Sequence, residues 1–543
     1  MQPLVIAKGA RNLHSPASES ILTPFAPSVY LIAALAVVVH FLFNRQYGFF
    51  RDELYYAACG ERLAWGYVDH APLIAFASAF TRALFGDSLF ALRLLPALSS
   101  APKVLLAGWM ARELGGAKFS QSFAALLTLL APIYLTFDNF FSMNAFEPLF
   151  WTLCAAIVLR ILTGGSPRLW LLVGVVAGIG LLNKHSMLFY GSGLALGLLL
   201  TPARKQFARV EIWLGAGIAF LFFLPNLLWE IHNGYPTIAL LHHVIGGKYT
   251  TVSPLAFVGQ QFLLVNPLAA PIWLAGLWLL LSGKTGRKPV GYYVEAPHLR
   301  LPQFGRYAVL GIAYLVVLLE MILLHGKIYY LAPAYIVLLA AGAVWWERQF
   351  LGRAALWAKL AVLAPLVLSG AIAAPLAMPI LPVAAAVKYT KFFGVQDVKV
   401  ENVPLNSLPQ LFGDMFGWPE QVQAVARAFH SLSPEEQSRV TLLAYNYGEA
   451  GAIDYLGKRY GLPKAISGHN QYGYWGPRGA SGDLVIAIGF REERLSRAFE
   501  EVQAVESISP AYALPEESGL TIYLCRKPLK NLSQSWPEWT YLN

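Results

Sequence analysis

Apolar residues gather in long runs along the first 380 residues, and short polar or basic stretches separate these runs. An α-helix needs about 20 apolar residues to cross a hydrocarbon core of about 30 Å. The pattern therefore predicts a polytopic α-helical membrane protein. About eleven spans are expected, near residues 27–45, 89–111, 119–136, 142–162, 169–184, 186–201, 210–229, 255–282, 305–324, 328–346 and 355–380.

The pattern changes after residue 387, where charged and apolar residues mix over short distances. Residues 440–444, 484–488 and 520–525 form short apolar segments that predict buried strands, and residues 422–431 predict a helix. We therefore expect two domains, a membrane domain of residues 1–386 and a soluble α/β domain of residues 387–543.

Basic residues predict the orientation of the spans, because cytoplasmic loops of membrane proteins are enriched in Lys and Arg. Five alternate loops carry such residues, at 112–118, 160–168, 204–209, 284–300 and 348–353. These loops are expected inside, and the loops between them outside. An odd number of spans then places the C-terminal domain on the outer face.

Composition supports a membrane protein and excludes other classes. The 543 residues are 56% hydrophobic and 13% charged, whereas soluble proteins carry about 25% charged residues. The net charge of +10 comes from short clusters between apolar runs and not from one basic stripe, so no nucleic-acid partner is expected. Cys59, Cys154 and Cys525 are too widely spaced to indicate a zinc site or a disulfide framework.

Two adjacent carboxylates, Asp52 and Glu53, follow the first predicted span, where water meets lipid. A carboxylate at the edge of a low-dielectric region has its charged form destabilised unless it is paired, which tunes a general base toward neutral pH. Asp52 is our candidate base. The alternative is that both carboxylates solvate a helix end and pair with Arg51 or Arg62.

A second group of polar residues falls in the same outer loop and in the outer loop near residues 229–250. The first loop carries Asp69 and His70, and the later loop carries His243 and Lys248. A carboxylate and a histidine from two loops could hold one divalent ion, which would leave Lys248 for a phosphate. The alternative is an ordinary hydrogen-bonded loop.

Polar residues also stand at the outer ends of later spans. Asn144 and Glu147 are three residues apart at the start of one span, which puts them on one helix face. Lys327 precedes Tyr329 and Tyr330, a combination that suits a headgroup with both phosphate and sugar. The alternatives are a helix-dipole charge for Glu147 and a lysine that snorkels to lipid headgroups.

These motifs together resemble the GT-C membrane glycosyltransferases, specifically bacterial relatives of protein O-mannosyltransferases and of the lipid A aminoarabinose transferase. The resemblance covers the whole chain and rests on Asp52-Glu53, the stretch from Asp69 to Leu73, Asn144 with Glu147, the stretch from Lys327 to Tyr330, and the outer C-terminal domain. It implies a GT-C fold with about eleven spans. It also implies a bacterial inner-membrane enzyme whose site and C-terminal domain face the periplasm.

The resemblance implies a reaction. A hexose or pentose moves from a polyprenyl-phosphate carrier to a hydroxyl of a lipid, glycan or protein acceptor, with inversion at the anomeric carbon. Asp52 would be the base, with Glu53 beside it in the catalytic group, and Lys248 and Lys327 would hold the leaving phosphate. His70 stands where relatives often carry a lysine, Asn144 where many carry an aspartate, and Asp69 with His243 could hold a divalent metal ion.

Other functions remain open. A transporter or flippase for a lipid-linked sugar would also place polar residues at helix ends, although it would want them on both faces or at the midplane. A non-catalytic assembly protein would leave Asp52 and Lys327 unexplained. In the C-terminal domain, Tyr447, Tyr472, Tyr474 and Trp475 could stack on sugar rings of an acceptor, or could form the core.

Overall fold

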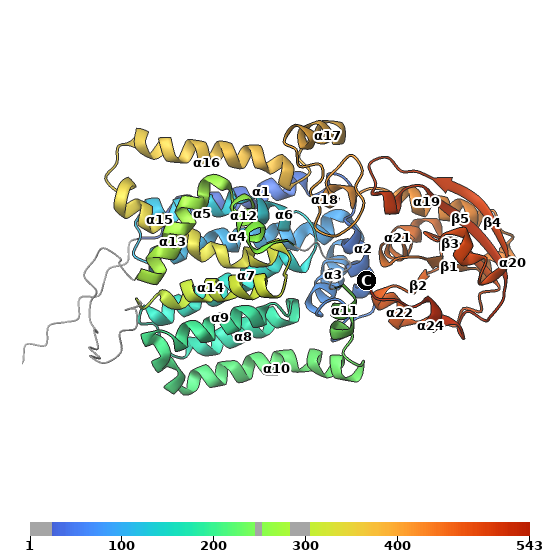
Figure 1. Cartoon of the computed structure of the whole chain (residues 1–543), viewed down its shortest axis with the longest axis horizontal. Coiled ribbons are helices and arrows are strands. Elements are labelled where there is room, and N and C mark those ends of the chain that lie inside the picture. The colour runs from blue at the N-terminus through green and yellow to red at the C-terminus, as the bar shows by residue number, and fades with distance from the viewer. Residues whose placement is uncertain (1–23, 245–251, 283–304) are drawn as a thin grey trace, which may run out of the picture.

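The structure is a computed structural model, and it describes residues 24–244, 252–282 and 305–543. Lys248 and the basic loop at residues 284–300 lie outside the described residues. A helical body occupies one end of the molecule and a unit with a β-sheet the other (Figure 1).

The helical body begins with two long helices, α1 (Pro27–Phe43) and α4 (Leu89–Glu113), and two shorter helices between them, α2 (Arg51–Gly60) and α3 (Leu73–Phe85). The other helices of the body are α5 (Lys118–Leu129), α6 (Pro132–Phe137), α7 (Met143–Leu162), α8 (Leu169–Asn183), α9 (Met187–Leu199), α10 (Val210–His232), α11 (Pro236–Val244), α12 (Pro254–Leu264), α13 (Ala270–Ser282), α14 (Ala308–Leu323), α15 (Tyr335–Trp346), α16 (Leu356–Ala377) and α17 (Val383–Phe392). Short 3₁₀ turns link some of them, among them η3 (Ile328–Ala334) before α15.

All eleven regions predicted to span the membrane are helical in the structure. Two of them are broken. Pro132 separates α5 from α6, because proline cannot donate the hydrogen bond that would continue the helix. The pair α12 and α13 bends by 98° at Asn266, whose φ of 83° lies in the left-handed region.

Fewer segments are long enough to cross a membrane as single helices. By length and composition, five of the described segments qualify, namely α4, α7, α10, residues Ile328–Leu351 and α16, and the bent pair makes a sixth if it is one span. The remaining apolar helices have 10–17 residues: α1, α3, α8, α9 and α14. The number of spans therefore stays a prediction.

The C-terminal unit is built on a five-stranded sheet in the order β2-β1-β3-β5-β4. Its strands are β1 (Thr441–Ala444), β2 (Ile466–Ser467), β3 (Leu484–Ile488), β4 (Phe499–Ile508) and β5 (Leu520–Pro528), and its helices are α18 (Gln410–Gly413), α19 (Trp418–His430), α20 (Pro434–Arg439), α21 (Tyr447–Leu456), α22 (Asn470–Trp475), α23 (Glu492–Leu495) and α24 (Trp536–Trp539). β1 runs parallel to β2 and β3, whereas β5 is antiparallel to β3 and β4. The three predicted strands are β1, β3 and β5. The predicted division of the chain at residue 386 stays a prediction, and residue 386 lies inside α17.

Each face of the sheet has its own apolar core. Val425 of α19 and Ile453 of α21 pack against Ile486 on one face, and Trp536 and Trp539 pack with residues such as Val485 on the other. The first core also contains residues of α2 and α3, such as Leu54 and Ile74. Those two helices therefore join the helical body to the sheet unit.

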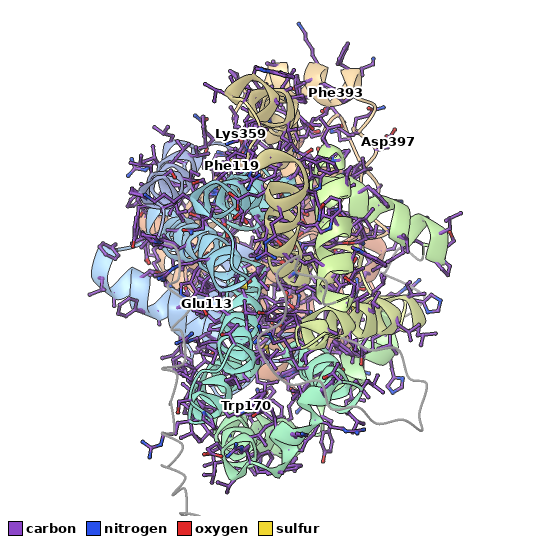
Figure 2. The ribbon with its side chains drawn as sticks, turned by 90° about the vertical axis from the view of Figure 1, so that its left-hand side faces the viewer. Glu113, Phe119, Trp170, Lys359, Phe393 and Asp397 are labelled. Carbon is purple, nitrogen blue, oxygen red and sulfur yellow. The ribbon has the colours of Figure 1, made fainter. Side chains whose placement is uncertain are left out.

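Four of the predicted inner loops, at residues 112–118, 160–168, 204–209 and 348–353, are described, and they lie at the end of the body farthest from the sheet. Figure 2 views that end, where Glu113, Phe119, Trp170 and Lys359 are labelled. Glu113 is the last residue of α4, before the loop to α5, and Lys359 lies in the first turn of α16. The loops that we expect inside and the sheet unit that we expect outside are therefore at opposite ends of the molecule.

Candidate active site

The candidate base lies where the helical body meets the sheet unit. Asp52 is in the first turn of α2, and Tyr447 is the first residue of α21. The Tyr447 hydroxyl donates a hydrogen bond to Asp52 Oδ1 over 3.0 Å. The side chain of Asp52 is 28% exposed, and its Oδ1 also lies 3.8 Å from Nε of Arg51.

Glu53 has a different environment from its neighbour. Its side chain is fully buried and makes a bidentate ion pair with Arg93 of α4, at 2.7 and 2.9 Å. It also accepts hydrogen bonds from the backbone N–H groups of Phe50 and Phe141. Glu53 thus has no access to a substrate in this structure, and its prediction as a catalytic group is replaced by a structural role, because all four contacts are internal.

A network of charges connects Asp52 to Lys327. Arg51, next to Asp52, donates to Glu401 over 3.1 Å, and Lys327 donates to the other oxygen of Glu401 over 3.0 Å. Arg51 also lies 3.8 Å from Asp414. Burial raises the pKa of Asp414 to about 7, although Arg51 opposes this shift. Neither Glu401 nor Asp414 was a predicted site residue, because each meets Arg51 only through the fold.

Asn144 and Glu147 converge on a lysine from the next helix pair. Lys184 donates to Asn144 over 2.9 Å and to Glu147 over 2.8 Å. Its ammonium lies 4.4 Å from the ring centroid of Tyr330 and 5.7 Å from that of Tyr329. The structure therefore brings four predicted residues together around the ammonium group of Lys184. They are Asn144 and Glu147, at the start of α7, and Tyr329 and Tyr330, in η3.

Asp69 is held by both parts of the molecule. It accepts from the Tyr55 hydroxyl over 2.7 Å and from Asn470 of the sheet unit over 3.1 Å. Tyr56, on the same helix as Asp52, lies among these acidic groups. Burial raises the pKa of Tyr56 well above its ordinary value, and the charges of Asp52 and Asp69 raise it further.

His70 is buried among tyrosines, with 5% exposure. Its ring stacks on Tyr67 at 4.5 Å and meets Tyr56 edge to face at 5.0 Å. Burial lowers the pKa of His70, which favours a neutral ring. Its Nδ1–H donates to the Ala71 carbonyl, which leaves Nε2 as an acceptor without a partner among the described residues. A neutral acceptor does not suit a phosphate oxygen, which argues against the predicted phosphate contact of His70.

The predicted metal site is not assembled by the described residues. They contain no group of three or more His, Cys, Asp or Glu residues placed to hold an ion. Both oxygens of Asp69 already accept hydrogen bonds, and His243 is exposed at the end of α11. Asp69 and His243 would supply two ligands at most, so the described residues do not complete a metal centre, no chemical step is assigned to one, and the divalent ion stays a prediction.

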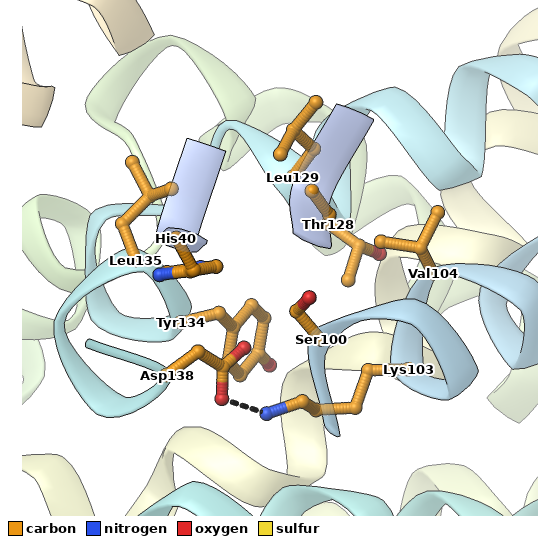
Figure 3. A pocket seen from close by; sticks show the side chains of 10 residues that line it. His40, Ser100, Lys103, Val104, Thr128, Leu129, Tyr134, Leu135 and Asp138 are labelled. Carbon is orange, nitrogen blue, oxygen red and sulfur yellow. Dashed lines mark hydrogen bonds and ion pairs between the residues drawn. The ribbon is translucent and has the colours of Figure 1, made fainter. Parts of the chain in front are cut away.

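A second buried ion pair supports the loop before α7. Lys103 of α4 pairs with Asp138 and also donates to the Ala145 carbonyl over 2.9 Å. The pair borders a cavity of about 10 Å³, also lined by His40, Ser100 and Tyr134 (Figure 3). That volume is close to the smallest that holds one water molecule. The sequence analysis missed this pair, although a lysine inside an apolar run is a signal for a buried partner.

Two of the four aromatic residues proposed for acceptor binding belong to the interior. Tyr447 and Tyr472 are buried, with 5% and 1% exposure. Tyr474 is 42% exposed, and the guanidinium of Arg62 lies 4.9 Å from the ring centroid of Trp475. Tyr474 and Trp475 remain the candidates with an accessible face.

Comparisons with known proteins agree with the resemblance. Residues 69–229 match the family described as dolichyl-phosphate-mannose-protein mannosyltransferase. Over 243 residues the chain is 27% identical to the lipid A galacturonosyltransferase RgtD of Rhizobium johnstonii, a match that covers 44% of this chain and 50% of that protein. The chain thus spans about half the length of this curated relative.

Solved structures show the same fold. The crystal structure of ArnT from Cupriavidus metallidurans bound to undecaprenyl phosphate matches with a TM-score of 0.59 and 15% identity, over 91% of this chain and 97% of that chain. The apo structure of the same protein matches with a TM-score of 0.60 and 14% identity, over the same shares of the two chains. The predicted resemblance to the GT-C glycosyltransferases is therefore confirmed, and the fold is that of ArnT.

Proposed function

Because the chain has a GT-C fold and resembles GT-C glycosyltransferases in sequence, we propose that it transfers a sugar from a polyprenyl-phosphate donor to an acceptor hydroxyl. The reaction is expected on the periplasmic face of a bacterial inner membrane, and the sugar is a hexose or a pentose. The observation that carries this proposal is the placement of Asp52, which is 28% exposed, accepts a hydrogen bond from Tyr447 and lies beside the network of Arg51, Glu401 and Lys327.

The chemistry follows from that placement. Asp52 takes the proton of the acceptor hydroxyl while the oxygen of that hydroxyl attacks the anomeric carbon of the sugar. The bond from that carbon to the phosphate oxygen breaks, and the polyprenyl phosphate leaves with the electron pair. Attack opposite the leaving group inverts the anomeric centre. The proton is then on Asp52 and passes to solvent.

The leaving phosphate needs cations, and two lysines are placed to supply them. Lys184 and Lys327 are held by Glu147 and Glu401, respectively. Each lysine is nearly neutralised by its carboxylate. A phosphate would therefore share the ammonium group with that carboxylate and be bound through directed hydrogen bonds. The rings of Tyr329 and Tyr330 lie beside Lys184. Lys248 remains a predicted further contact outside the described residues.

Undecaprenyl phosphate is the lipid bound in one structure of ArnT, which makes its glycosylated form the first donor to test here. Lipid A is the first acceptor to test, because the matched relative is a lipid A galacturonosyltransferase. Glycan and protein acceptors follow. The predicted divalent ion is tested in the same assay by adding EDTA, because a required ion would make turnover depend on added metal.

The decisive experiment uses purified protein in liposomes with an undecaprenyl-phosphate sugar on one side. We expect the sugar to appear on the acceptor and an equal amount of free undecaprenyl phosphate to form. Movement of intact donor to the other leaflet, without release of undecaprenyl phosphate, would instead identify a flippase and overturn the proposal.

A further inference from the structure

We infer that Tyr447 is a positioning residue for Asp52, so that the C-terminal unit forms part of the catalytic centre. This inference rests on the proposed function and deepens it. It assigns to Tyr447 a task that differs from acceptor stacking, because the buried ring has no face open to a sugar. The contact joins residues that are 395 positions apart in the chain.

The ring of Tyr447 is held on both sides. It stacks on Tyr55 of α2 at 4.6 Å and on His469 at 4.6 Å. His469 in turn stacks on Tyr541 at 4.6 Å, with 9° between the ring planes. A ring fixed between two others cannot swing away, so its hydroxyl stays aimed at Asp52.

The backbone of Tyr447 is also fixed. Asn446 caps α21 by accepting from the N–H of Glu449, and Glu449 accepts from the N–H of Asn446. This reciprocal pair is a capping box, which sets the direction in which the helix begins. A second link from the same unit, from Asn470 to Asp69, holds the loop after α2 in place. The sheet unit is therefore linked to the helical body at Asp52 and at Asp69.

A hydroxyl at this position has two chemical effects on Asp52. A hydrogen bond donated to a carboxylate favours its ionised form, which is the form that accepts a proton. The bond also engages Oδ1 and thereby orients Oδ2, so that the acceptor hydroxyl meets the carboxylate in one geometry. Burial raises the pKa of Tyr447 well above its ordinary value, so it remains a donor at neutral pH.

The test replaces only the hydroxyl, with the full-length Tyr447→Phe variant in liposomes. Tyr455→Phe is the matched control, because Tyr455 is on the same helix and its hydroxyl has no hydrogen-bond partner among the described residues. We expect Tyr447→Phe to lower kcat by about 10-fold to 100-fold at neutral pH, with the KM for the donor unchanged. The acidic limb of its pH profile should move to higher pH, whereas Tyr455→Phe should match the native protein.

The Asp52→Asn background separates positioning from folding. With Asp52 already neutral, Tyr447→Phe should cause no further loss of the residual rate. A loss of the same size in both backgrounds, or a native pH profile in Tyr447→Phe, would overturn this inference while native turnover still supports the proposed function. An absence of turnover by the native protein with every donor would overturn the proposed function, and this inference with it.

Discussion

Neighbouring carboxylates of this protein have opposite environments. Glu53 is fully buried, and its oxygens pair with Arg93 and accept hydrogen bonds from two backbone N–H groups. The side chain of Asp52, in contrast, is 28% exposed. A helix separates consecutive side chains by about 100° around its axis. Glu53 therefore faces α4, while Asp52 faces Tyr447 of α21.

Asp414 gives a prediction for pH dependence. Burial raises its pKa from 3.8 to about 7, so the folded protein binds this proton more tightly than the unfolded chain. The contribution of Asp414 to the free energy of unfolding is fully present below about pH 4 and is lost as the pH rises toward 7. The Asp414→Asn variant should therefore melt at a higher temperature than the native protein at pH 8, by about 2–4 °C for each kcal/mol gained, and close to it at pH 4.

Thermal melting of both proteins in detergent at the two pH values checks this expectation. Glu500→Gln is the control, because it removes an exposed carboxylate of the same unit. A lower melting temperature for Asp414→Asn at pH 8 would show that the ion pair with Arg51 outweighs the burial of Asp414.

Residue patterns indicated some of the site and missed the rest for physical reasons. Asn144 and Glu147 could be placed on one helix face from their spacing, and one lysine binds both. For Tyr447 the sequence leaves acceptor stacking and core packing both open, because it does not show that α21 packs against α2. Long-range pairs such as Arg51 with Glu401 depend on the fold and leave no local pattern.

At the scale of elements, α2 carries the candidate base and is held from two sides. The pair of Glu53 and Arg93 fixes it to α4, and the stack of Tyr55 on Tyr447 fixes it to α21. Such a helix keeps its position relative to both neighbours, which general-base catalysis requires.

Breaking the buried ion pair tests this support. Arg93→Met leaves the Glu53 carboxylate buried without a counter-charge, which costs about 3–5 kcal/mol. The matched control is Arg427→Met, because the pair of Arg427 and Glu506 is exposed and should contribute about 0–1 kcal/mol. Denaturation in detergent should separate the two variants clearly.

Restoring neutrality should then recover stability. The double variant Arg93→Met with Glu53→Gln is expected to be more stable than Arg93→Met alone, because no charge is left buried. Equal stability of Arg93→Met and Arg427→Met would contradict the view that this pair holds α2 in place.

Elements of regular pattern could be predicted and irregular ones could not. Long apolar runs indicated the helices of the body, and α3 was missed because its 13 residues are too few for a span. β4 was missed because most of its side chains are exposed, including charged ones, as is typical of an edge strand. The break before Pro132 was open to prediction from the proline itself.

At the scale of the whole molecule, the four predicted inner loops that the structure describes and the sheet unit lie at opposite ends (Figure 1). In a membrane this arrangement places the basic loops on one face and Asp52 with the sheet unit on the other. The positive-inside rule then predicts that the sheet unit is outside.

Labelling of introduced cysteines tests this orientation, because the three native cysteines are buried. Gln503→Cys places an exposed thiol on β4, and Lys118→Cys places one at the predicted inner end of α5. In right-side-out vesicles, a membrane-impermeant maleimide should label Gln503→Cys at once and Lys118→Cys only after permeabilisation. The reverse pattern would place the sheet unit inside.

The central claim, that Asp52 is the base of a sugar transfer, is tested most directly by release of free undecaprenyl phosphate in a single turnover. The native protein and Asp52→Asn are compared at equal amounts and with equal melting temperatures. We predict that the variant releases the lipid about 10²-fold to 10⁴-fold more slowly. Release at the native rate by folded Asp52→Asn would contradict the account.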